Sequence, residues 1–345
     1  MKSREQRLGA AANLDIPPFQ PRRPWITGDL QTVRNAVTSP KVDLSRWSRR
    51  RLWLAVSDGD ALAAALFAEE RGGRRPLVVL IHGLTGCEDS VYLRRSARFW
   101  LDLGHPVLCL NLRGNSPSRS YCRGHYHAGR SDDLRDALED LAVQAPKLVE
   151  SGLIAVGYSL GGNLLVKMLA EDGEALGVRA AATVSAPLDL MATSKRVHQA
   201  RNRPYQRWLL RRIKSEAVAA PARVSSGERA AIEGARSVYE FDDTFIAPHF
   251  GFAGARDYYE QCSAQRFLGA VRLPLLAVQA RDDPWISPEP YDRFPWAENP
   301  NLSLLLTSGG GHVGFHAADD PAPWHDRVIA VFVASVLDGG SGDAR

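Results

Sequence analysis

Short apolar runs alternate with amphipathic stretches along most of the chain. Runs this short and this apolar are typical of strands that are buried on both faces of a parallel sheet. They lie at residues 77–82, 107–112, 153–156, 180–185, 275–279 and 302–307. Helical patterns occupy residues 89–103, 132–150, 162–171 and 324–337. The alternation predicts an α/β fold with a mostly parallel central sheet flanked by helices.

The region before the first of these runs has a different character. Residues 1–50 are rich in proline, arginine and polar residues and show no sustained periodicity, so we expect them to wrap the surface of the core. Residues 52–68 fit a β-hairpin with Asp58-Gly59 as its turn.

One interval between strands is too long for a simple crossover. A crossover needs about a dozen residues, whereas the interval from residue 187 to 272 is several times longer, and its pattern is helical and basic. We therefore predict a core at residues 51–187 and 273–340, interrupted by a helical lid insertion at residues 188–272.

A glycine-rich hexapeptide, Gly157-Tyr158-Ser159-Leu160-Gly161-Gly162, lies between an apolar run and a helical stretch. Small residues around a serine allow the strained strand-to-helix turn that lifts a nucleophilic hydroxyl clear of a sheet. The same residues fit an ordinary βα turn that binds a phosphate or no ligand at all. The strand and helix on either side favour the nucleophile, and Ser159 is the candidate.

A serine hydroxyl needs a general base, and the base needs a carboxylate that fixes its tautomer. His312 follows three glycines directly after the apolar run at residues 302–307. The pair Asp282-Asp283 follows the run at residues 275–279. The chain order serine, aspartate, histidine is that of α/β-hydrolases rather than of other serine-triad folds.

An oxyanion hole requires two backbone N–H donors near the nucleophile. The residue after the serine, Leu160, supplies one candidate amide. The loop His82-Gly83-Leu84-Thr85-Gly86 follows an earlier strand and offers the amide of Leu84 as the second. We expect His82 itself to be structural.

Composition excludes several other classes. The 345 residues carry a formal charge of +4 with the basic residues dispersed, so nucleic acid is not an expected partner. The four cysteines have no metal or redox spacing and are expected to be reduced. No apolar run is long enough for a membrane span or a secretory signal, so the expected location is the cytoplasm. We interpret four further histidines as surface or supporting residues and expect no metal and no organic cofactor: His125, His127, His249 and His316.

Taken together, these motifs resemble the YheT-like branch of the α/β-hydrolases, bacterial relatives of the mammalian abhydrolase-domain lipases. The resemblance is carried by Gly28 to Thr32, His82 to Gly86, Leu112 to Asn115, Tyr126 to Gly129, Gly157 to Asn163, Val184 to Pro187, Glu240 to Asp243, Tyr258 to Ala264, Asp282 to Pro284 and Gly310 to Phe315.

This resemblance implies a serine hydrolase of carboxylic esters with a helical lid, and it assigns the triad to the same serine, acid and histidine. One departure is Asp29, where the family often has histidine before Leu-Gln-Thr. Asp29 is far from the candidate triad in sequence, so the departure concerns the role of the N-terminal segment.

The choice between the two aspartates is open, with Asp283 favoured. In many α/β-hydrolases the acid follows a glycine by three residues, and Ala280 takes that glycine's place only if Asp283 is the acid. Asp282 is then expected to cap the turn.

The predicted lid carries many basic residues among apolar ones, and Asp242 and Asp243 are candidate partners for them. One interpretation is an amphipathic helix that lies on an anionic membrane and suits a lipid ester. The other is a solvated lid face on which arginine stems cover apolar surface. The basic residues are Lys195, Arg196, Arg201, Arg203, Arg207, Arg211, Arg212 and Lys214.

The function expected from the sequence is hydrolysis of a small-molecule ester through an acyl-enzyme, with lipid or acylglycerol esters as candidate substrates. Two alternatives stay open. The same residues could transfer the acyl group to an alcohol or thiol, or the fold could be a binding module with a silent triad.

Overall fold

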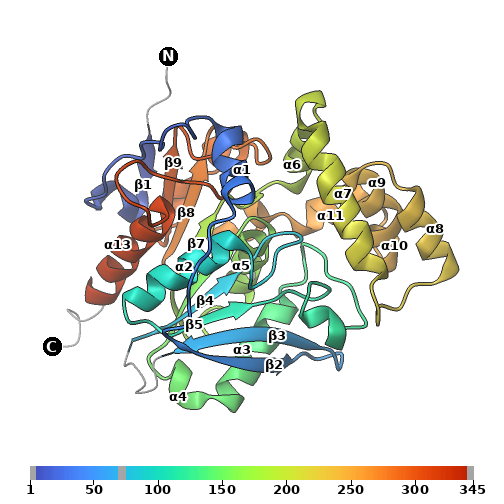
Figure 1. The fold of residues 1–345 in the computed structure, drawn as a ribbon, viewed down its shortest axis with the longest axis horizontal. Coiled ribbons are helices and arrows are strands. Elements are labelled where there is room, and N and C mark those ends of the chain that lie inside the picture. The colour runs from blue at the N-terminus through green and yellow to red at the C-terminus, as the bar shows by residue number, and fades with distance from the viewer. Residues whose placement is uncertain (1–4, 69–74, 340–345) are drawn as a thin grey trace.

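The computed structural model describes residues 5–68 and 75–339. Within them the sheet has nine strands in the order β1-β9-β8-β7-β6-β4-β5-β3-β2 (Figure 1). The strands β4 to β9 are parallel to their neighbours in this group, as the apolar runs predict. Their bounds are β4 Leu77–Ile81, β5 Val107–Leu110, β6 Leu153–Tyr158, β7 Val178–Val184, β8 Leu275–Ala280 and β9 Leu302–Thr307. The predicted fold class is confirmed.

Different helices cover the two faces of the sheet (Figure 1). Along β6, Leu153 and Ala155 pack on the side of α3 and α5, whereas Ile154, Val156 and Tyr158 pack on the side of α2 and α13. A strand that is covered on both faces has no need of alternating polar residues, which explains the uniformly apolar runs. The core helices are α2 (Val91–Asp102), α3 (Asp132–Gln144), α4 (Pro146–Val149), α5 (Leu160–Glu171), α12 (Glu289–Arg293) and α13 (Trp324–Gly339).

The predicted hairpin is confirmed. Strand β2 (Ser48–Ala55) pairs antiparallel with β3 (Ala61–Ala68), and the chain turns at Asp58 and Gly59. Gly59 has φ +84°, a conformation that glycine adopts at little cost. Strand β3 then pairs antiparallel with β5, so the hairpin forms one edge of the sheet.

The N-terminal segment is more regular than its pattern predicts. Strand β1 (Gln6–Leu8) pairs antiparallel with β9 at the opposite edge of the sheet, and α1 (Gly28–Thr38) is a regular helix capped by the Thr27 hydroxyl. Only two residues of α1 are buried, Gly28 and Gln31. A helix that docks through a glycine and a glutamine has no apolar stripe, so the periodicity of residues 28–38 gave no signal.

The long interval between β7 and β8 folds into helices that pack on one another through a cluster of their own, separate from the two clusters beside the sheet. In Figure 1 most of these helices lie beside the core. They are α6 (Leu190–Val197), α7 (Arg203–Val218), α8 (Ser226–Gly234), α9 (Val238–Phe241), η4 (Asp242–Ile246), α10 (Ala247–His249) and α11 (Ala255–Cys262).

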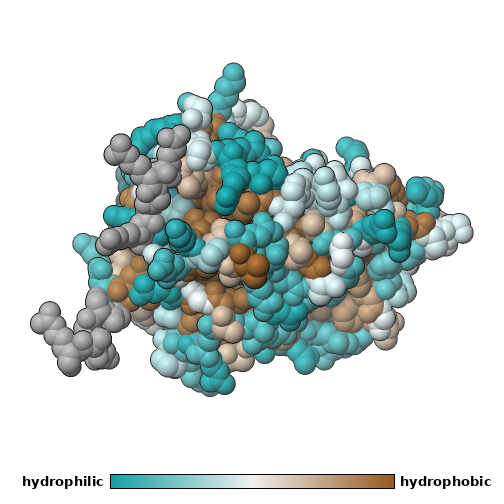
Figure 2. All heavy atoms as spheres, turned by 90° about the horizontal axis from the view of Figure 1, so that it is seen from below, coloured by the Kyte–Doolittle hydropathy of each residue, from teal (hydrophilic) through white to brown (hydrophobic). Residues whose placement is uncertain are grey.

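The surface is mixed in character. On the face drawn in Figure 2, hydrophobic residues are interspersed with hydrophilic ones. No helix among the described residues combines the length and the apolar character that crossing a membrane requires.

Candidate active site

Ser159 lies at a sharp turn between β6 and α5, with φ +51° and ψ −123°. A Cβ at Gly161 would lie 2.4 Å from the His82 carbonyl oxygen, and one at Gly157 would lie 2.6 Å from the Gly161 carbonyl oxygen. Only glycine fits this close approach of backbone segments. The strained backbone of a non-glycine residue is therefore held by its surroundings, as a nucleophile elbow requires.

The imidazole of His312 lies beside the serine, with Nε2 3.0 Å from Ser159 Oγ. The loop after β9 presents it: Gly311 has φ +62°, and a Cβ there would lie 2.3 Å from the Gly28 carbonyl oxygen of α1. The amide of His312 donates to Thr32 Oγ1 at 2.8 Å. Helix α1, which the sequence pattern does not reveal, therefore supports the loop that carries His312.

Of the two aspartates, Asp283 is the one that contacts this histidine. Its side chain is fully buried, and Oδ2 lies 2.9 Å from His312 Nδ1. The other oxygen, Oδ1, accepts hydrogen bonds from the amides of Trp285 at 2.8 Å and Ile286 at 2.9 Å. Both oxygens of this buried carboxylate are thus satisfied, and the orientation toward the imidazole is fixed.

Asp282 points to a different part of the same loop. Its Oδ1 accepts a hydrogen bond from the amide of Gly311 at 2.8 Å, and burial raises the pKa of its carboxyl group. Asp282 therefore braces the backbone next to His312, whereas the sequence leads us to expect that it caps its own turn.

The amides of Leu84 and Leu160 lie on two segments that meet at the serine. Leu160 is the first residue of α5, and a Cβ at Gly83 would lie 2.8 Å from Ser159 Cβ, so the loop that carries Leu84 runs against the elbow. Neither amide donates a hydrogen bond within the parts of the chain that the structure describes. Unpaired N–H groups beside a nucleophile are the arrangement that stabilises an oxyanion.

His82 is structural, as we expect from its place in the sequence. Its Nε2 accepts from the Leu112 amide at 3.0 Å, so the proton lies on Nδ1, which donates to the Gly83 carbonyl at 2.7 Å. Burial lowers the pKa of His82 to about 4, which keeps the ring neutral.

The other histidines differ in how exposed they are. His249 is exposed and pairs with Glu228, as a surface residue would. His125 and His316 are each only 4% exposed, so of the two expected roles, surface or supporting, the surface one is wrong for these two. Within the described ranges, no group of three or more histidine, cysteine, aspartate or glutamate side chains is arranged to hold a metal ion.

A cavity of about 150 Å³ lies between Ser159 and the helices that follow β7. Its wall is mostly apolar and aromatic and includes Leu84, Leu160 and Trp285. The ring of Trp285 stacks on His312 with centroids 4.5 Å apart. The cavity therefore joins the serine to a space that would accept an apolar group.

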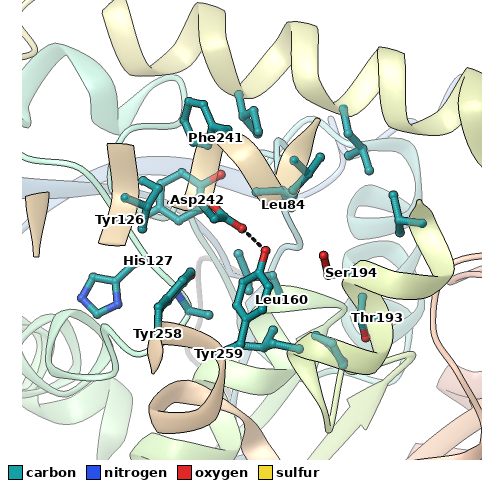
Figure 3. Close-up of a pocket in the computed structure, with 18 of the residues that line it drawn as sticks. Leu84, Tyr126, His127, Leu160, Thr193, Ser194, Phe241, Asp242, Tyr258 and Tyr259 are labelled. Atoms are coloured by element: carbon teal, nitrogen blue, oxygen red, sulfur yellow. Dashed lines mark hydrogen bonds between the residues drawn. The ribbon is translucent and has the colours of Figure 1, made fainter. Parts of the chain in front are cut away.

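Several polar side chains also line the cavity, and Figure 3 shows Asp242 and Tyr259 among them. The hydroxyl of Tyr259 donates to Asp242 Oδ2 at 2.5 Å, and burial raises the pKa of Asp242 to about 7. Asp243 accepts from the amide of Ala255 at 2.7 Å. The expected pairing of these two aspartates with lid arginines is therefore wrong. No local pattern in the sequence predicts the cavity, because residues far apart in the chain line it.

Comparison with known proteins places this geometry in a class. The family model described as "alpha/beta hydrolase fold" matches residues 76–319. The chain therefore belongs to the α/β-hydrolase fold family. A solved structure of an esterase from Pyrococcus furiosus superposes with a TM-score of 0.57 at 16% identity and covers 84% of this chain and 93% of that one. A membrane phospholipase A superposes with a TM-score of 0.57 at 18% identity and covers 89% of this chain and 92% of that one.

Relatives of similar sequence show which kind of α/β-hydrolase the chain is. The protein named "Putative esterase YheT" of Escherichia coli (strain K12) is 32% identical over 329 residues, which cover 94% of this chain and 95% of that one. "Phospholipase ABHD3" of Bos taurus is 28% identical, with 77% of this chain and 65% of that one covered. The resemblance to the YheT-like branch is thereby confirmed, and the chain is a carboxylic ester hydrolase of the esterase and lipase type.

Proposed function

We propose that the enzyme cleaves carboxylic esters through an acyl-enzyme formed on Ser159. The observation that carries this proposal is the continuous hydrogen-bonded series from Ser159 Oγ to His312 Nε2 at 3.0 Å and from His312 Nδ1 to Asp283 Oδ2 at 2.9 Å. The series ends at the cavity described above, where an ester would lie.

Each residue of the site then has a defined role in the proposed hydrolysis. Ser159 Oγ attacks the acyl carbonyl while His312 Nε2 takes its proton, and Asp283 holds the imidazole in the required tautomer and stabilises the imidazolium. The amides of Leu84 and Leu160 donate to the oxyanion of the tetrahedral intermediate. His312 passes its proton to the leaving alkoxide. Water, activated by the same imidazole, hydrolyses the acyl-enzyme and regenerates the serine.

The cavity wall supports an ester with an apolar chain as the substrate. Leu190, Val197, Leu209, Ile213 and Phe245 line it along with aromatic side chains. Each methylene group buried in such a wall contributes about 0.8 kcal/mol. A lipid or acylglycerol ester would gain more from this wall than an acetate ester.

We also propose that residues 188–272 form a lid over this site, between core segments at residues 51–187 and 273–340. Helix α7 turns its buried residues Leu209, Ile213 and Ala217 toward the cavity, and its arginines lie on the exposed side. Because the apolar face is already occupied, this arrangement favours a solvated basic surface over a helix inserted in a membrane.

Contacts tie the helices after β7 to other parts of the chain. Arg196 donates to the Asp283 carbonyl oxygen at 2.7 and 3.0 Å. Arg201 pairs with Asp29 at 2.6 Å, so the residue that departs from the family pattern connects α1 to the proposed lid.

We expect a fluorophosphonate probe to label the enzyme at Ser159, because the probe reacts only with an activated serine hydroxyl. Peptide mapping of the labelled protein identifies the residue. In parallel, a panel of p-nitrophenyl esters from two to twelve carbons should show kcat/KM rising by about tenfold or more from the acetate to a medium chain. A folded protein that is neither labelled nor active would contradict the proposal.

Acyl transfer is a second candidate function, favoured by one relative. A protein of Saccharomyces cerevisiae (strain ATCC 204508 / S288c) named "Medium-chain fatty acid ethyl ester synthase/esterase 2" is 29% identical, with 74% of this chain and 61% of that one covered. An alcohol can replace water in the deacylation step without any change of residues. We expect added ethanol to divert part of the product to the ethyl ester, measured by chromatography; no ethyl ester would exclude this candidate.

A further inference from the structure

Three arginines from different segments gather around His316, on the other side of the loop that carries His312. Arg22 belongs to the N-terminal segment, Arg34 to α1 and Arg95 to α2. The amide of Arg22 donates to the His316 carbonyl at 2.9 Å, and its Nε donates to the Ala317 carbonyl at 2.9 Å. All three guanidinium groups lie close enough to lower the pKa of His316, although its burial is the larger cause. We call these three residues the arginine cluster.

The arginine cluster lacks counter-charge. Within residues 5–68 and 75–339, no carboxylate lies within ion-pair distance of any of its three guanidinium groups. Arg34 Nε, Arg34 Nη1 and Arg95 Nε are buried and have no hydrogen-bond partner there. Buried donors without acceptors, on groups that repel one another, are costly, and each such group requires an explanation.

A neighbouring carboxyl group, that of Asp326, does not neutralise the positive charge of the arginine cluster. Asp326 at the start of α13 is fully buried and accepts hydrogen bonds from Ser96 Oγ at 2.7 Å and Tyr158 at 3.3 Å. Burial raises the pKa of Asp326 to about 7, so near neutral pH it carries only part of a charge. Three positive charges therefore face at most one negative charge.

Two buried histidines complete the site. His316 is 4% exposed and His325 is 1% exposed, and no ring nitrogen of either makes a hydrogen bond within the described part of the chain. His325 Nε2 lies 3.6 Å from Asp326 Oδ2, whereas neither nitrogen of His316 has such a neighbour among the described residues. Burial, followed by the nearby arginines, lowers the pKa of His316 to about 2, so its ring is neutral and can donate one hydrogen bond. The unpartnered nitrogens of a side chain as deeply buried as His316 point to a ligand that completes its hydrogen bonds.

We propose that the arginine cluster, with His316, binds a phosphate group. A tetrahedral oxyanion would accept from several guanidinium N–H groups at once and would supply the missing negative charge. The three arginines are only partly buried, so the site is open to solvent. The ligand is either free phosphate or the phosphate of a lipid headgroup, since the same donors suit both.

Bound phosphate would connect segments that also support the active-site loop. The side chain of Gln31 in α1 makes two hydrogen bonds to the backbone of His316. Its Oε1 accepts from the His316 N–H at 2.7 Å, and its Nε2 donates to the His316 carbonyl oxygen at 3.2 Å. Arg34 lies one turn further along α1. The site is separate from Ser159, so its existence does not depend on the proposed esterase chemistry.

Thermal unfolding of the full chain tests the proposal. At constant ionic strength, exchange of chloride for saturating inorganic phosphate should raise the Tm of the wild type by about 3–5 °C, because a ligand that binds only the folded state stabilises it. Arg34→Met and Arg95→Met should each lose most of this rise. Arg229→Met, at an exposed arginine of α8, should keep it.

The Tm of the variants measured in the absence of phosphate provides a second test. In chloride alone, Arg34→Met should have a Tm equal to or above that of the wild type, because it removes a guanidinium with two buried nitrogens that have no partner among the described residues. The absence of a phosphate effect in the wild type would overturn the proposal. So would a phosphate effect that both cluster variants retain, since phosphate would then bind elsewhere.

Vesicles distinguish the two sources of phosphate. If the ligand is a lipid headgroup, the wild type should sediment with vesicles of phosphatidylcholine containing phosphatidylglycerol, and Arg34→Met should sediment several-fold less. If the ligand is free phosphate, both proteins should sediment equally, while the Tm difference in inorganic phosphate persists.

Discussion

Ser159→Ala should lower kcat for a p-nitrophenyl ester by about 10⁶-fold, close to the loss seen when a triad serine is removed. The hydroxyl is the only group in the proposed mechanism that forms a bond to the substrate, and His312 cannot act as a nucleophile's base without it. Alanine keeps the Cβ and removes only the oxygen that lies 3.0 Å from His312 Nε2. Steady-state kinetics with the purified variant measures the loss.

The folded state of this variant should be nearly unchanged. Within the described residues, the only side-chain hydrogen bond of Ser159 is the one to His312, and an unpaired imidazole nitrogen beside the cavity can bind water. Ser335→Ala, at an exposed serine of α13, is the matched control and should keep its activity. A Ser159→Ala variant with the same Tm as the wild type and more than a tenth of its kcat would exclude Ser159 as the nucleophile.

The sequence predicts the elbow well because its determinants are local. Gly157 and Gly161 must be glycine for reasons that lie within a few residues of the turn and the neighbouring strand. The six buried strands are equally clear, since each is an uninterrupted apolar run. Most element ends differ from the predicted ones by only a few residues, as β6 shows, which continues to Tyr158. The helix predicted at residues 132–150 instead divides at Ala145, before Pro146, into α3 and α4.

Other parts of the site depend on contacts across long sequence separations, which a single sequence does not encode in any local pattern. Thr32 supports His312 across 280 residues, and Gln31 supports His316 across 285. Neither residue belongs to a periodic stripe, so nothing marked residues 28–38 as a helix. The departure at Asp29 becomes intelligible only when Arg201 is seen to pair with it.

Asp283→Asn should lower kcat by about 10⁴-fold, whereas Asp282→Asn should lower it by less than about tenfold. An asparagine at position 283 can still accept the Trp285 and Ile286 amides through its carbonyl oxygen, which replaces Oδ1. Its NH₂ group then faces His312 Nδ1, favours the tautomer with a bare Nδ1, and places the remaining proton on Nε2. An imidazole in that tautomer cannot take the proton of Ser159.

At position 282, asparagine preserves the hydrogen bond to the Gly311 amide. Asp282 accepts a hydrogen bond from the Gly311 amide, and the asparagine oxygen can accept it as well. The two variants are therefore matched, since each replaces one carboxylate oxygen by nitrogen in neighbouring residues, and kinetics at saturating ester compares them directly. A larger loss at 282 than at 283, with both proteins folded, would reassign the acid. Because Asp283, and not Asp282, is hydrogen-bonded to the imidazole, the difference between the variants measures the effect of that hydrogen bond on kcat.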